Sequence, residues 1–144
     1  MADLLRILLV DDHVLFRKGI AALMTARKDL AVVGEASDGL QAAELARDRC
    51  PDVILMDVHM PRCSGLEAIP LVKQARPEAR IVMLTVSSED RDLFTAIKQG
   101  ADGYLLKDLE PSQLFDMLDG LRRGEAAIAP ALAGRILSEF RQLQ

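Results

Sequence analysis

Short runs of apolar residues, most of them ending at a charged or hydroxyl residue, recur along the chain and constrain its fold. Three runs show no alternation of polar and apolar residues, at residues 7–10, 53–56 and 81–85. Such runs are typical of strands that are buried on both faces, as in a parallel sheet. Two weaker runs, at residues 31–36 and 103–107, are interpreted as further strands.

Patterns of helical spacing fill the gaps between these runs, at residues 15–26, 40–49, 65–76, 90–99 and 111–123. Pro70 is expected in or near the first turn of the third helix, where proline is tolerated. A parallel crossover needs a connection long enough to hold a helix. The alternation therefore predicts an α/β fold, with a parallel sheet covered by helices on both faces.

Acidic, hydroxyl and ammonium side chains stand at the ends of four predicted strands: Asp11, Asp12, Asp57, Thr85 and Lys107. Ligands of such sheets bind outside the carboxyl ends of the strands, so these side chains are expected to share one site. Clustered carboxylates repel one another unless a cation lies among them, and Mg²⁺ prefers oxygen ligands. An ammonium and a hydroxyl suit phosphoryl oxygens. The set predicts a magnesium-bound aspartyl phosphate.

Each of these residues has a plainer interpretation when it is taken alone. Asp11 and Asp12 could cap a helix, and Asp57 could be a turn residue. Their convergence on one rim favours the site. His59 could act as a general base, but a loop side chain is more often exposed to solvent. His13 is interpreted as a helix N-terminal residue rather than a ligand.

Size and charge limit the possible functions. The 144 residues suit one domain, and the net charge of −4, without a basic run, argues against nucleic-acid binding by this chain. No apolar stretch reaches the roughly twenty residues that span a bilayer, and no N-terminal targeting segment is evident. A cytoplasmic protein without membrane contact is expected.

Residues 8–13, 55–61 and 100–108, together with Gly65 and Thr85, resemble the receiver domains of bacterial two-component response regulators. The likeness extends from residue 5 to about residue 130 and is greatest to the nitrate-regulator/LuxR-type (NarL/FixJ) subfamily. It implies a flavodoxin-like (βα)5 fold, a doubly wound parallel five-stranded sheet in the order 2-1-3-4-5.

The resemblance also implies roles for the acidic residues. Asp57 would be the phosphoacceptor. Asp11 and Asp12 would hold Mg²⁺ together with Asp57 and the backbone carbonyl of His59.

Three further residues receive roles from the family. Thr85 would hydrogen-bond the phosphoryl group, Lys107 would pair with it, and Tyr104 would be an aromatic switch that moves inward with the threonine. The chain departs from many receivers at Asp108, where a proline is common, and at Val86, whose bulk could narrow the approach to phosphorus.

Residues 1–124 are thus expected to form the receiver domain. Residues 125–144 are expected to be a linker, with a loop and a C-terminal helix, that leads to a helix-turn-helix DNA-binding domain outside this chain. The implied function is a non-enzymatic phosphorelay switch of transcription. Its partners would be a sensor histidine kinase, a second copy after phosphorylation, and DNA through that further domain.

Two other classes of protein remain as alternatives. A magnesium-dependent phosphatase of the haloacid-dehalogenase type also forms an aspartyl phosphate, but its Asp-x-Asp follows the first strand, whereas Asp11 and Asp12 are adjacent. A flavodoxin-like flavin protein needs a phosphate loop rich in Ser, Thr and Gly, and the two carboxylates would repel the flavin phosphate.

Overall fold

The computed structural model describes residues 4–143. Its sheet has six parallel strands in the order β2-β1-β3-β4-β5-β6. These are β1 (Leu5–Val10), β2 (Leu30–Ala36), β3 (Val53–Met56), β4 (Arg80–Thr85), β5 (Gly103–Leu106) and β6 (Ala127–Ile128). The predicted order of the first five strands is confirmed, and the structure adds β6.

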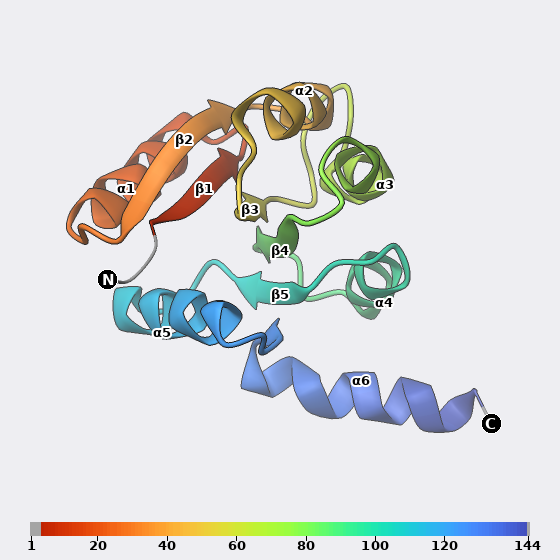
Figure 1. The fold of residues 1–144 in the computed structure, drawn as a ribbon. Helices are drawn as coiled ribbons and strands as arrows, with labels where there is room; N and C mark the ends of the chain where they lie inside the picture. The colour runs from red at the N-terminus through yellow and green to blue at the C-terminus, as the bar shows by residue number, and fades with distance from the viewer. Residues whose placement is uncertain (1–3, 144) are drawn as a thin grey trace.

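Six helices connect or follow the strands: α1 (Val14–Thr25), α2 (Gly39–Arg49), α3 (Gly65–Ala75), α4 (Asp90–Lys98), α5 (Pro111–Arg122) and α6 (Pro130–Gln142). Figure 1 shows α1 and α5 on one face of the sheet and α2, α3 and α4 on the other. Each face has its own buried apolar core. The doubly wound fold is therefore confirmed. Within residues 4–143, every helix is too short or too polar to span a bilayer.

The start of α3 explains the position of its proline. Ser64 Oγ accepts a hydrogen bond from Glu67 N, and Ser64 N donates to Glu67 Oε1, which together form a capping box. This box starts the helix at Gly65, so Pro70 lies inside the helix, beyond its first turn. The helix thus begins at the predicted residue, and Pro70 follows closely after its first turn.

The segment after α5 returns to the sheet. Residues 125–130 were predicted to form a loop, but Ala127 and Ile128 pair with Gly103 and Tyr104. A Cβ on Gly103 would lie 2.4 Å from Ala127 O, so glycine permits this close pairing. The apolar stretch at residues 126–129 is mostly alanine, which has little strand propensity, so the sequence did not indicate this strand. It brings α6 beneath β5 and α4 (Figure 1).

The helix α6 packs against the α4 side of the sheet. Leu132 is buried in the core of that side. Arg135 forms an ion pair with Asp90 at the start of α4 and donates a hydrogen bond to the carbonyl of Ser88. The predicted C-terminal helix is thus attached to the sheet domain through the first turn of α4.

Candidate functional site

The parallel register brings the predicted site residues to one rim. Val10 pairs with Met56, and β4 lies between β3 and β5. Asp57 N donates to the carbonyl of Val10, and Lys107 N donates to the carbonyl of Thr85. The residues that follow or end these strands therefore meet at the carboxyl edge of the sheet, as predicted.

A buried lysine joins two of the carboxylates. Lys107 Nζ lies 2.7 Å from Asp11 Oδ2 and 3.0 Å from Asp57 Oδ2, and all three side chains are at most 8% exposed. Burial alone would lower the pKa of Lys107, but the hydrogen bonds to Asp11 and Asp57 outweigh it and raise that pKa above its ordinary value. The ammonium is therefore held charged beside Asp57.

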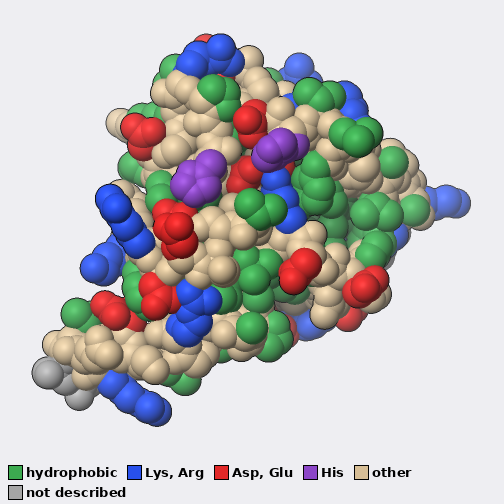
Figure 2. All heavy atoms as spheres, turned by 180° about the vertical axis from the view of Figure 1, so that it is seen from behind, with side chains coloured by type: hydrophobic (Ala, Val, Ile, Leu, Met, Phe, Trp, Pro, Cys, Tyr) green, Lys and Arg blue, Asp and Glu red, His purple; other side chains and the backbone are tan. Residues whose placement is uncertain are grey.

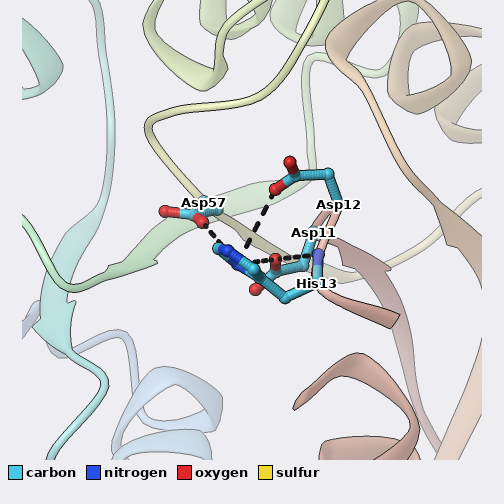
Figure 3. Close-up of side chains that lie close together, drawn as sticks. All are labelled: Asp11, Asp12, His13 and Asp57. Carbon is cyan, nitrogen blue, oxygen red and sulfur yellow. Dashed lines mark hydrogen bonds and ion pairs between the residues drawn. The ribbon is translucent and has the colours of Figure 1, made fainter. Parts of the chain in front are cut away.

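The carboxylates also form a group that can hold a cation. Atoms of Asp11, Asp12, His13 and Asp57 that could act as ligands all lie within 4.8 Å of one another (Figure 3). Asp12 Oδ1 is buried and accepts no hydrogen bond from any described residue. A buried carboxylate oxygen without a hydrogen-bond donor suits a metal ion, and the oxygen-rich set suits Mg²⁺. The site therefore fits the ion that the sequence implies.

His13 belongs to this group, although the sequence did not predict it as a ligand. It is the N-cap residue of α1, as expected, but its side chain makes no capping hydrogen bond. Figure 3 shows the ring turned toward the three carboxylates. Its Nδ1 lies 3.1 Å from Asp11 Oδ1 and 3.8 Å from Asp57 Oδ2.

The predicted hydroxyl and aromatic residues meet at Ser87. Thr85 is fully buried, and its Oγ1 accepts a hydrogen bond from Ser87 N at 3.2 Å. Tyr104 is also buried, and its hydroxyl donates to the carbonyl of Ser87 at 2.9 Å. Burial raises the pKa of Tyr104 to about 12, so the phenol stays protonated. Val86 is 74% exposed, so most of its bulk faces solvent.

Asp92 connects this loop to the one after β3. It is a buried residue in the first turn of α4. Its Oδ2 accepts a hydrogen bond from Ser87 Oγ at 2.5 Å and lies 3.2 Å from His59 Nε2. The His59 side chain is 68% exposed, as expected for a loop residue. Figure 2 shows both histidine side chains on one face, with acidic and basic side chains beside them. The sequence did not predict a role for Asp92.

The loop after β3 is held close to α3 and α2. Asp57 Oδ1 accepts a hydrogen bond from Val58 N, which leaves Oδ2 to Lys107. A Cβ on Gly65 would lie 1.9 Å from the carbonyl oxygen of Asp57, so only glycine fits there. Arg62, in the left-handed region at φ 65°, binds the buried Asp38 at the N-terminus of α2. These contacts fix the backbone that presents Asp57.

Residues 7–119 match the response regulator receiver domain, and the chain belongs to that family. The chain is 43% identical over 135 residues to the nitrate/nitrite response regulator protein NarL of Escherichia coli (strain K12), covering 94% of this chain and 62% of NarL. It is 45% identical over 143 residues to the transcriptional regulatory protein YxjL of Bacillus subtilis (strain 168), covering 99% of this chain and 66% of YxjL.

A solved structure agrees with these matches. The crystal structure of a two-component response regulator of the LuxR family from Aurantimonas sp. SI85-9A1 superimposes with a TM-score of 0.87 at 34% sequence identity, covering 95% of this chain and 98% of that one. The predicted NarL/LuxR-type subfamily is confirmed, and none of these matches supports the phosphatase alternative. The chain spans less than two thirds of the length of NarL and of YxjL.

Proposed function

We propose that Asp57 accepts a phosphoryl group from a sensor histidine kinase and that its modification switches a transcriptional output. The main support is the pairing of Asp57 Oδ2 with the buried ammonium of Lys107. A carboxylate oxygen of Asp57 attacks phosphorus, and the bond from phosphorus to the donor nitrogen breaks. Lys107 offsets charge on the phosphoryl oxygens. Thr85 Oγ1 accepts from Ser87 N and can at the same time donate its own proton to a phosphoryl oxygen.

Asp11, Asp12 and Asp57 would hold Mg²⁺, together with the backbone carbonyl of His59. Among the described residues no donor gives a hydrogen bond to Asp12 Oδ1, which supports this assignment. The bound ion would supply positive charge to the phosphoryl oxygens. Asp11 also binds Lys107 and so positions the ammonium beside Asp57.

The switch would work through contacts that differ between the unmodified and the phosphorylated protein. A phosphoryl group adds charge and acceptor oxygens, so Thr85 and Lys107 gain contacts only after modification. A movement of Thr85 would be passed to Ser87, which holds Tyr104 through its carbonyl and Asp92 through its hydroxyl. We expect α4 to respond, and we expect phosphorylation to hold Tyr104 in the buried position that it already has.

The broader setting of the switch is also proposed. Residues 1–124 act as the receiver, and residues 125–144 link it to a DNA-binding domain beyond this chain. We further infer a cytoplasmic location, a homodimer after phosphorylation and a non-enzymatic role; the names of the relatives support only the regulatory role. The chain would assist its own phosphorylation and dephosphorylation.

Incubation with acetyl phosphate and Mg²⁺ tests the proposal. The wild-type chain should gain the mass of one phosphoryl group in a hydroxylamine-sensitive form, and Asp57→Asn should gain none. A phosphatase would release phosphate continuously without a lasting adduct. Equal labelling of Asp57→Asn would show that another residue is the phosphoacceptor.

A further inference from the structure

The side chain of His13 faces the acidic site although nothing in helix capping requires it to do so. Its backbone N donates to Asp11 Oδ1 at 2.8 Å, and Nδ1 lies 3.1 Å from the same oxygen. The ring is thus set beside Asp11 through two contacts. It lies among the carboxylates that are proposed to hold a metal ion (Figure 3).

The distances from the ring to the carboxylates resemble those within a coordination shell. Neighbouring ligands of an octahedral ion are about 3 Å apart when each is about 2.1 Å from the ion, and opposite ligands are about 4.2 Å apart. His13 Nδ1 is 3.1 Å from Asp11 Oδ1, 3.7 Å from Asp12 Oδ1 and 3.8 Å from Asp57 Oδ2. All three values lie between these limits.

The chemistry of the ring suits ligation. A metal ion binds the neutral imidazole through a nitrogen lone pair. Nδ1 lies 3.1 Å from Asp11 Oδ1 and 3.3 Å from Lys107 Nζ, and an ion among the carboxylates would take its lone pair while Nε2 carries the ring proton. An imidazole nitrogen strengthens the binding of Zn²⁺, Ni²⁺ and similar ions, whereas a set of oxygens alone suits Mg²⁺ and Mn²⁺.

We propose that His13 Nδ1 is a ligand of the ion held by Asp12 and Asp57, and that it raises the preference of this site for first-row transition ions over Mg²⁺. The inference rests on the proposed metal site. It concerns only the nitrogen ligand, so it can fail while the carboxylate site stands.

Cobalt(II) provides the test, because it is paramagnetic and shifts the proton resonances of a bound imidazole far from the rest of the spectrum. The chain has two histidines, so a shifted, exchangeable ring N–H is assigned by its loss from His13→Asn or from His59→Asn. Asparagine at position 13 remains a favoured N-cap residue. Its side chain could bind a metal ion only through its oxygen, because the amide nitrogen is a hydrogen-bond donor. Calorimetric titrations of each protein with Co²⁺ and with Mg²⁺ give the ratio of the two affinities.

We expect the shifted resonance to disappear in His13→Asn and to remain in His59→Asn. The ratio of Co²⁺ to Mg²⁺ affinity should fall about tenfold or more in His13→Asn, since even partners outside the coordination shell change metal affinity by that much. An unchanged ratio, or a resonance that only His59→Asn removes, would overturn the role of His13.

Asp12→Asn separates the two levels of the proposal. If this variant loses both ions while His13→Asn binds both as the wild type does, the carboxylate site is correct and the nitrogen ligand is wrong. If Asp12→Asn binds both ions with wild-type affinity, the proposed metal site itself is wrong, and the inference falls with it.

Discussion

His59 Nε2 lies 3.2 Å from Asp92 Oδ2, so the loop that follows the strand of Asp57 is joined to the first turn of α4. The same oxygen of Asp92 accepts the hydroxyl of Ser87. Asp92 therefore connects the proposed phosphorylation site with the helix that we expect to respond to it.

A double-mutant cycle tests this connection. His59→Ala should speed amide exchange in residues 90–98, because α4 loses its contact with the loop after β3. When Asp92→Ala is already present, His59→Ala should speed the exchange of α4 little further. The coupling energy between the two substitutions should be about 0.5–1 kcal/mol. Arg91→Ala, an exposed neighbour in the same helix, is the control and should have no such effect. Additive effects of the two substitutions would mean that the contact carries no energy.

Two glycines provide a matched pair for the loop that presents Asp57. Gly65→Ala should lower the free energy of unfolding by about 3 kcal/mol, because the new methyl group meets the backbone of Asp57 at 1.9 Å. Gly19→Ala in α1 meets no atom within 4 Å and should raise stability by roughly 1 kcal/mol. Urea unfolding of both variants measures the difference, and a Gly65→Ala protein as stable as the wild type would contradict the close contact.

Replacement of the buried lysine should expose the repulsion between carboxylates. Lys107→Met leaves Asp11 and Asp57 without their ammonium and should lower the free energy of unfolding by about 3 kcal/mol. Mg²⁺ should then stabilise the variant more than the wild type, because an added cation replaces the lost charge. Lys18→Met, at an exposed pair with Glu35, should change stability by less than about 1 kcal/mol. Equal stabilisation of both proteins by Mg²⁺ would count against a shared site.

Asp38 should make stability sensitive to acid. The backbone hydrogen bond from Gln41 and the pair with Arg62 hold the pKa of Asp38 below its ordinary value of 3.8. A lowered pKa in the folded protein stabilises it above that ordinary value, and this contribution is lost as pH falls through the folded pKa. Because asparagine keeps the N-cap, Asp38→Asn removes only the charge; it should cost about 1 kcal/mol near pH 7, from weaker hydrogen bonds, and progressively less below the ordinary pKa of 3.8. Urea unfolding of both proteins across this pH range measures the effect. A difference in unfolding free energy between wild type and Asp38→Asn that grows as the pH falls would contradict the prediction.

The sequence predicted the site well for residues whose position depends only on the order and direction of the strands. Asp57 follows an uninterrupted apolar strand, and parallel strands bring their carboxyl ends to one edge, so its meeting with Asp11 and Lys107 needed no further information. The ring of His13 and the carboxylate of Asp92 depend on side-chain directions and on the packing of α4 against the loop. Nothing in their spacing along the chain signals those contacts.

The short strand β6 could not be predicted for a related reason. Ala127 and Ile128 lie in a short alanine-rich apolar stretch with little strand propensity, and their pairing depends on the small Gly103 across from them.

The central claim is that chemistry at Asp57 reaches α4 through Thr85 and Ser87. Amide exchange with and without beryllofluoride, a phosphoryl mimic, tests it most directly, with the mimic's binding followed by fluorine NMR. Before binding, residues 85–99 should exchange faster than α5. On binding they should slow in the wild type and in Thr85→Ser, which keeps the hydroxyl, but not in Thr85→Ala. Unchanged exchange of residues 85–99 in the wild type with the mimic bound would contradict the claim, even if Asp57 is phosphorylated.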